Sequence, residues 1–130
     1  MFTFSVFFSL MGMEHNFKKL DVWKRSIDLV EFVYQLTKIF PDEEKFGLIS
    51  QMRRCSVSVA SNIAEGSSRQ TVKHFNHFLI LSLGSVFELQ TQAIIALRLQ
   101  YLNNYQYVEL DKQLVILRKM LFGFQKTLKV

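Results

Sequence analysis

The chain has 130 residues, of which 49% are hydrophobic and 21% are charged, and its formal net charge is +5. This balance is typical of one globular domain and excludes a disordered chain. The single cysteine, Cys55, excludes an internal disulfide and is compatible with a reducing compartment, so we expect a cytoplasmic protein. One proline and five glycines leave few breakpoints, which favours a few long helices over many short strands.

The basic excess lies in the C-terminal half of the chain. Residues 104–130 contain five basic and two acidic residues, whereas residues 41–66 contain three basic and four acidic ones. Such a distribution permits an anionic partner without requiring one.

Residues 1–12 differ from the rest because they carry no charge and include four phenylalanines. They lack the basic start and cleavage site of a signal peptide, and they are too short to span a bilayer. We interpret 1–12 as a non-native or disordered extension, with Met13 as the natural start and 13–130 as the single domain. The alternative is an apolar arm that docks on a partner.

A first helix is predicted over about residues 17–39. Apolar residues recur in it at spacings of three and four, which is typical of a core-facing stripe: Leu20, Trp23, Ile27, Val30 and Tyr34. We therefore interpret Trp23 as a core residue and not as a ligand platform.

A second helix is predicted over about residues 42–65, between Pro41 and the stop signal at Gly66. Its apolar face consists of Ile49, Met52, Ser56, Val59 and Ile63. Nearly opposite, a polar stripe poor in Lys and Glu consists of Gln51, Arg54, Ser58, Ser61 and Glu65.

A third helix is predicted over about residues 71–102, and it is apolar nearly all round. Between His74 and Leu97 the only carboxylate is Glu88. A membrane span is disfavoured because Glu88, Gln90 and Gln92 fall in the middle of the helix. A helix of this kind in a soluble protein is buried on all sides. One small bundle cannot cover it, so we expect an oligomer.

Burial would require a partner for the Glu88 carboxylate. Arg54 on the polar stripe is the best candidate, either inside one chain or across a subunit boundary, because its guanidinium can hold a carboxylate with two parallel bonds. Arg53 is a weaker candidate, and the remaining alternative is that Glu88 reaches solvent at a helix edge.

A fourth helix is predicted over about residues 107–128, after a turn at Asn103–Asn104. It has a regular apolar seam made of Leu110, Leu114, Leu117, Leu121, Phe124 and Leu128. Lys112, Lys119 and Lys126 lie opposite the seam at sevenfold spacing. They form either a solvated outer face or, together with Arg118 and Lys129, a nucleic-acid-binding strip. Val115 and Phe122 add a second apolar patch, which suggests a subunit contact.

Catalytic motifs are scarce. The sequence has no phosphate-binding Gly-rich loop and no cysteine cluster, and His74 and His77 have no third metal ligand nearby, so neither a metal nor a cofactor is expected. Arg69 and His74 have the Arg-x4-His spacing of HEPN-type ribonucleases. However, Gln70 stands directly after the Arg, where those enzymes usually have Asn, Asp or His. On one helix the two side chains would lie about 140° apart. A ribonuclease is therefore the least favoured alternative.

The stretch from Phe40 to Gly66 carries a family resemblance. The residues that carry it are, in chain order, Trp23, Phe40-Pro41 with Glu44, Gln51-x-x-Arg54, and Asn62-Ile-Ala-Glu65-Gly66. This order resembles the pattern of the four-helix-bundle family of 23S rRNA intervening-sequence proteins. Gly84, Ser85 and Glu88 also resemble that pattern, and the resemblance covers about residues 17–128. Cys55 departs from the alanine that is usual there, and both residues are small.

The resemblance implies an all-α, up-down-up-down four-helix bundle in a ring-like homopentamer from a bacterial cytoplasm. It implies a non-enzymatic scaffold associated with rRNA or other nucleic acid, with a reverse transcriptase as a candidate partner, because relatives include the accessory proteins of diversity-generating retroelements. It gives the family-motif residues named above a structural or interface role. No membrane and no small-molecule substrate are expected. The alternative function is a protein-interaction adaptor that does not bind nucleic acid.

Overall fold

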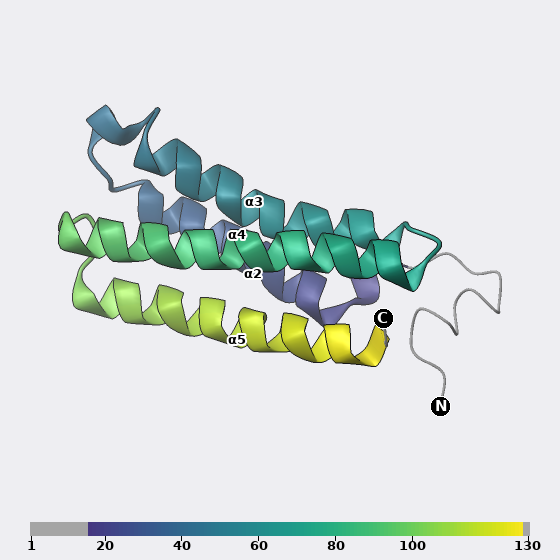
Figure 1. Ribbon diagram of the computed structural model, residues 1–130. Coiled ribbons are helices and arrows are strands. Elements are labelled where there is room, and N and C mark those ends of the chain that lie inside the picture. Colours follow the sequence, from purple (N-terminus) through teal and green to yellow (C-terminus); the bar gives the residue numbers. More distant parts are fainter. Residues whose placement is uncertain (1–15, 129–130) are drawn as a thin grey trace.

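The computed structural model describes residues 16–128, and this part of the chain is all-α (Figure 1). Four long helices, each antiparallel to the next, form the predicted bundle. They are α2 (Asp21–Thr37), α3 (Leu48–Ser67), α4 (Val72–Arg98) and α5 (Asn104–Leu128), and the 3-10 helices η1 (Phe17–Lys19) and η2 (Asp42–Glu44) precede α2 and α3. The predicted extension 1–12, the predicted start at Met13 and Lys129 lie outside the described residues.

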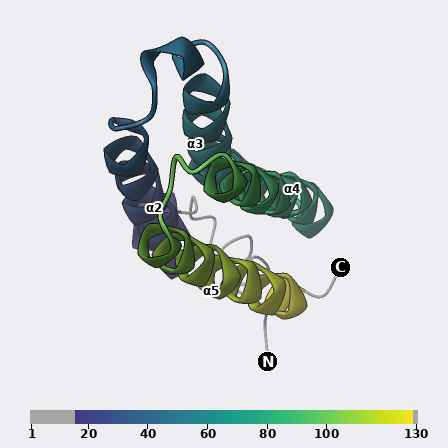
Figure 2. The ribbon, with the colours of Figure 1, turned by 90° about the vertical axis from the view of Figure 1, so that its left-hand side faces the viewer.

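Each helix packs against its neighbours in the sequence, and α2 closes the bundle against α5 (Figure 2). The α5 seam is confirmed, because Leu110, Leu114, Leu117 and Leu121 are completely buried. The predicted apolar face of α3 is also confirmed, since Met52, Ser56, Val59 and Ile63 are completely buried.

Local hydrogen bonds explain where the two C-terminal helices begin and end. The hydroxyl of Thr71 accepts from the His74 amide at 3.2 Å and so caps α4. At the other end of α4, Gln100 takes a left-handed conformation with φ of 65°, and the amide of Tyr101 donates to the Ala96 carbonyl at 2.9 Å. The side chains of Asn103 and Gln106 then cap α5, each accepting from the other's amide, at 2.8 and 2.9 Å.

The predicted start of the second helix at Asp42 is wrong. Residues Asp42–Glu44 form only the short helix η2, and α3 begins at Leu48 after Gly47. Glu44 explains the change, because its Oε1 accepts from the Leu48 amide at 3.0 Å and supplies the cap of α3. Its Oε2 accepts from the Tyr101 hydroxyl at 2.9 Å, which ties this loop to the turn between α4 and α5.

The predicted core stripe of the first helix is confirmed at Leu20, which is buried, and is otherwise wrong in register. Tyr34 is exposed and Trp23 is only half-buried, with its ring in edge contact with Phe17 at 5.2 Å between centroids. The residues that α2 buries are Val22, Ser26, Leu29, Val33, Leu36 and Thr37. Two of these are polar, and both are satisfied locally: Ser26 donates to the Trp23 carbonyl at 2.6 Å and Thr37 to the Val33 carbonyl at 2.8 Å.

The expectation that α4 is buried on all sides does not hold within one chain. Its length and composition are those of a membrane span, with a mean hydropathy of 1.5 in its most apolar window, and 44% of that window is buried. The exposed apolar residues form two adjacent rows with sevenfold spacing. The α5-side row is Ile80, Phe87 and Ile94, and the α3-side row is Leu81 and Ile95 with Glu88 between them.

Candidate functional site

Several residues of the family motif meet in a polar seam between α3 and α4. The hydroxyls of Ser58 and Ser85 are 2.9 Å apart, and the Asn62 amide group donates to the Ser58 hydroxyl at 3.0 Å and to its carbonyl at 2.9 Å. The Cys55 thiol donates to the Ser85 carbonyl at 3.0 Å. We call these four residues, with Glu88, the α3–α4 seam. Of the predicted polar stripe of α3, only Ser58 takes part in these bonds, and the other members are exposed: Gln51, Arg54, Ser61 and Glu65.

Cys55 is a packed hydrogen-bond donor in this seam. Burial, followed by the nearby Glu88 carboxylate, raises the pKa of the Cys55 thiol to about 12. Its Sγ lies 3.6 Å from Oε2 of Glu88. The thiol therefore stays protonated at neutral pH, and it lacks the thiolate character that nucleophilic cysteines require.

Within one chain, the expected burial of Glu88 and its expected ion pair are both wrong. The residue is exposed, and among residues 16–128 the only ion pair joins Arg69 to Glu65, at 3.1 Å. Arg53 is used elsewhere, since its Nε donates to the Thr37 hydroxyl at 2.9 Å and its guanidinium lies 4.5 Å from the Tyr34 ring centroid. Arg54 is exposed. A single chain leaves both Arg54 and Glu88 open to solvent, because both lie on its outer surface.

The remaining motif residues support helix contacts. Gly66 lets α4 approach α3 closely, since a Cβ there would lie 2.8 Å from the Cβ of Phe78. Pro41 and Glu44 belong to the loop that begins α3, and Gln51 is exposed on its outer face. Glu65 holds Arg69 at the end of α3. Gly66, Glu44 and Glu65 thus have structural contacts.

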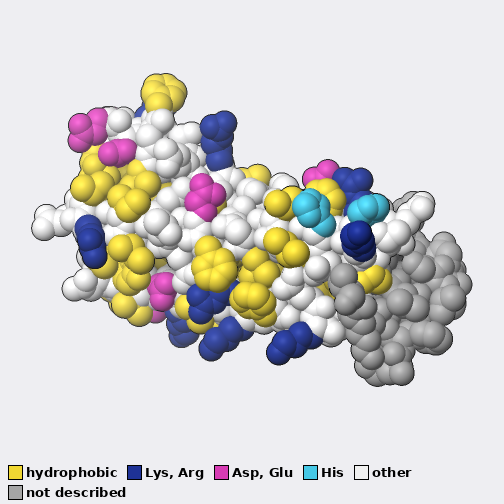
Figure 3. Space-filling view, viewed as in Figure 1, with side chains coloured by type: hydrophobic (Ala, Val, Ile, Leu, Met, Phe, Trp, Pro, Cys, Tyr) yellow, Lys and Arg dark blue, Asp and Glu magenta, His cyan; other side chains and the backbone are white. Residues whose placement is uncertain are grey.

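The second candidate surface is the outer side of α5. Lys112, Lys119 and Lys126 are all exposed there, as predicted from their position opposite the leucine seam. The guanidinium of Arg118 faces α4 instead, 5.4 Å from the Phe87 ring centroid. Figure 3 shows basic side chains along the edge where α5 runs, beneath an apolar band over α4. Helical spacing could not reveal the contact between Phe87 and Arg118, because it depends on the register of two helices.

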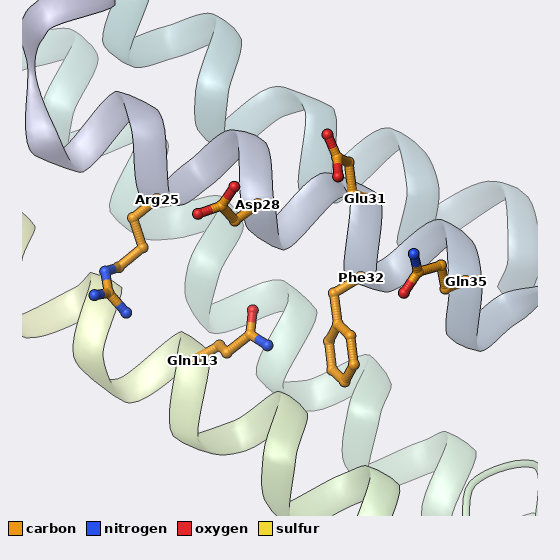
Figure 4. A pocket seen from close by; sticks show the side chains of 6 residues that line it. All are labelled: Arg25, Asp28, Glu31, Phe32, Gln35 and Gln113. Carbon is orange, nitrogen blue, oxygen red and sulfur yellow. The ribbon is translucent and has the colours of Figure 1, made fainter.

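A hollow of about 390 Å³ lies between α2 and α5 (Figure 4). Arg25 and Phe32 extend from α2 toward α5, and Gln113 extends from α5 toward α2. Asp28, Glu31 and Gln35 complete the lining. These side chains include no histidine, cysteine or hydroxyl group.

Arg69 lies in the turn between α3 and α4, and His74 and His77 lie in the first two turns of α4. Among the described residues no group of three His, Cys, Asp or Glu side chains could hold a metal ion. The guanidinium of Arg69 is bonded to Glu65 and lies 4.6 Å from the Phe78 ring centroid. His74 lies in the first turn of α4, and its backbone amide is bonded to Thr71.

Fold and surfaces together define an antiparallel four-helix protein whose family-motif residues lie on helix faces and in the loop before α3. Residues 18–123 match the family described as 23S rRNA-intervening sequence protein. The chain belongs to this family, as its motif resemblance predicts.

Comparison with solved structures gives the same fold. A crystal structure of a protein with unknown function from the S23 ribosomal protein family of Bacteroides thetaiotaomicron matches with a TM-score of 0.75 and 24% sequence identity. The match covers 81% of this chain and 95% of that one. No curated protein matches.

Proposed function

We propose that this protein is a non-enzymatic, self-associating scaffold that binds nucleic acid through the basic outer side of α5. One observation carries the proposal: Lys112, Lys119 and Lys126 are all exposed on one side of α5, and no acidic residue follows Lys112 in the chain. A row of cations without interspersed carboxylates favours the phosphates of a nucleic acid, which release counterions when neutralised. The family's description, which refers to 23S rRNA, supports an RNA partner.

Self-association is proposed through the α3–α4 side of the chain. The α3-side row of α4 exposes Leu81 and Ile95, at 43% of their surface each, on either side of the Glu88 carboxylate. A second copy of this chain would cover these apolar residues and could supply Arg54, which has no ion pair among residues 16–128, to Glu88. The family resemblance favours a ring of five copies. A ring would repeat the basic side of α5 and so strengthen binding to a long polyanion.

A binding experiment with a charge-matched control tests the nucleic-acid proposal. Fluorescence anisotropy with a labelled RNA should show binding that weakens steeply as salt is raised. The triple variant Lys112→Glu, Lys119→Glu and Lys126→Glu should lose this binding and keep its oligomeric mass. The control is Lys24→Glu, Lys38→Glu and Lys45→Glu, which makes the same change in net charge at three exposed lysines elsewhere.

Four outcomes decide between the alternatives. Retained binding by the control and loss by the α5 variant support the proposal, whereas equal losses would show only an effect of net charge. An absence of wild-type binding at low salt would reject it. RNA that is recovered shortened after incubation would instead support the ribonuclease alternative.

A protein-interaction adaptor is the second candidate, and the loop between α2 and α3 favours it. Ile39 and Phe46 are exposed there at 66% and 89% of their surface. An aromatic side chain held out on a hydrogen-bonded loop is typical of a docking point for a protein partner. A reverse transcriptase is a partner of this class that is worth testing by co-purification. Loss of the complex on Phe46→Glu, with RNA binding absent, would favour the adaptor.

A further inference from the structure

Exposed aromatic rings and cations are interleaved along the junction of α4 and α5. Phe87 on α4 and Phe122 on α5 expose 47% and 45% of their surface. The guanidinium of Arg118 lies over the Phe87 ring, and Phe122 follows Arg118 by one helical turn. Phe122 also falls between Lys119 and Lys126 in the sequence, three and four residues from them. It therefore lies beside the exposed row of Lys112, Lys119 and Lys126, which we call the lysine row. We call Phe87, Arg118 and Phe122 the α4–α5 platform.

The Arg118 guanidinium is held in place without neutralisation of its charge. Its Nη1 donates to Oε1 of Gln90 at 3.3 Å, and Nε2 of the same Gln90 donates to Oδ1 of Asp111 at 3.1 Å. The bridging amide keeps Arg118 against Phe87, and no ion pair of Arg118 occurs among residues 16–128. A guanidinium has five N–H donors, so most of them remain available for an external anion.

This combination matches the chemistry of an unpaired nucleic-acid strand. Such a strand presents phosphates together with bases whose faces are open, and base faces stack on aromatic side chains and on guanidinium planes. A duplex offers the same phosphates but keeps its base faces stacked inside. The lysine row alone would bind both forms, whereas the exposed rings of the platform add stabilisation only for the unpaired one. The platform lies along the α5-side row of α4, beside and distinct from the α3-side row assigned to self-association.

We propose that the α4–α5 platform makes this protein selective for single-stranded over double-stranded nucleic acid, with bases stacking on Phe87 and Phe122 and phosphates held by Arg118 and the lysine row. The inference rests on the nucleic-acid binding proposed above and adds the form of the partner. The platform reads base faces and phosphates, which RNA and DNA share.

The test compares labelled oligo-uridine, oligo-deoxythymidine and a mixed-sequence RNA duplex of equal length. About 20 nucleotides suffices, because single-strand sites span roughly 4–16 nucleotides. The wild-type oligomer should bind the single strands more tightly than the duplex. Phe87→Ala and Phe122→Ala should each weaken single-strand binding by about fivefold or more and leave duplex binding nearly unchanged. The matched control is Phe46→Ala, an exposed phenylalanine on the distant α2–α3 loop.

A second measurement keeps an aromatic ring at position 122. Phe122→Trp keeps a ring at the platform, and its added fluorescence should be quenched by single strands and much less by duplex. Phe122→Tyr should retain wild-type affinity because the ring is preserved. A stronger response to one of the two oligonucleotides would identify the natural strand as RNA or DNA.

The possible failures are distinguishable. If the wild type binds neither single strands nor duplex, the proposed function itself fails. If it binds both equally, and the Phe87 and Phe122 variants behave like Phe46→Ala, the platform is rejected while the lysine row remains a nucleic-acid surface.

Discussion

Among the described glycines, Gly66 is the one at which α3 and α4 approach each other most closely. A Cβ at this position would lie 2.8 Å from Cβ of Phe78 and 3.3 Å from the carbonyl oxygen of Phe75, both of which belong to the firmly packed α4. Neither neighbour is the free end of a flexible side chain. The final glycine of the Asn-Ile-Ala-Glu-Gly run is therefore explained by helix packing.

Gly66→Ala should lower the free energy of unfolding by roughly 1–3 kcal/mol, because overpacking forces the two helices apart. Gly123→Ala is the matched control, since nothing lies within 4 Å of a Cβ there and the position is exposed in α5. It should stabilise the protein by roughly 0.5–1 kcal/mol through helix propensity. Urea unfolding of both variants measures the difference. Equal effects would show that α4 can move away from α3 without cost.

At the scale of helices and loops, Glu44 joins two turns that are far apart in the sequence. Its carboxylate accepts from the Leu48 amide and from the Tyr101 hydroxyl, and these two bonds, in that order, lower the pKa of Glu44 below its usual value. The same contact raises the pKa of Tyr101. The Tyr101 ring also packs against Phe40, at 5.3 Å between centroids. The loop before α3 and the turn before α5 therefore stabilise each other.

The lowered pKa of Glu44 makes its contribution to the free energy of unfolding depend on pH. Because the folded pKa of Glu44 is depressed, its stabilisation is complete above the unfolded value of 4.5 and is lost as the pH falls through the lower folded pKa. The difference in unfolding free energy between wild type and Glu44→Ala should thus be constant near neutral pH and shrink below pH 4.5. Urea titrations across this range measure it. A difference that stays constant in acid would mean that Glu44 acts without its charge.

Tyr101→Phe measures the contribution of one of the two hydrogen bonds that Glu44 accepts. It keeps the ring contact with Phe40 and removes only the hydroxyl donor. Its pH dependence should be weaker than that of Glu44→Ala, because the Leu48 amide is the larger cause of the pKa shift.

The elements themselves were largely predictable, because periodicity is strongest where a stripe is purely apolar. The leucine seam of α5 and the apolar face of α3 were predicted correctly for this reason. The stripe of α2 was not, since Ser26 and Thr37 bond to their own helix and so can be buried despite their hydroxyls. Likewise, α3 begins later than predicted because Glu44 caps it at Leu48. A side chain that bonds to an amide four residues later leaves no periodic signal.

The candidate surfaces were predictable only in part. The exposed lysine row follows from sevenfold spacing on one helix, and its position was correct. The exposure of Glu88, the Cys55–Ser85 bond and the Phe87–Arg118 contact depend on how two helices meet, which spacing along one helix does not determine. Within one chain Glu88 is exposed, contrary to the predicted burial, because it lies in the outer α3-side row of α4.

For the whole molecule, the uncovered half of α4 is the central feature. We expect light scattering on the purified protein to report the mass of a pentamer of the 15.3 kDa chain. Leu81→Glu with Ile95→Glu should reduce this mass, because both side chains are exposed in the single chain and the change places charges where the second copy would pack. Phe46→Glu, a similar change on the α2–α3 loop, should leave the mass unaltered. A monodisperse wild-type monomer at micromolar concentration would contradict the self-association proposal.

A charge exchange examines the proposed pairing across the subunit boundary. Arg54→Glu alone should weaken the oligomer, since it would place two carboxylates together, and adding Glu88→Arg should restore it. If the exchange restores nothing, Arg54 and Glu88 do not meet between subunits.

The closure of α2 and α4 by α5 also has a consequence during synthesis of the chain. Val86 and Leu89 of α4 are completely buried in the finished bundle, and α5 is the last of the four helices to be made. At about 5–20 residues per second, the 25 residues of α5 take about 1–5 s to translate. During that interval the nascent chain carries an α4 that is uncovered on the side awaiting α5 as well as on its outer face. Newly made chains therefore expose the apolar α4 to chaperones before α5 can cover it.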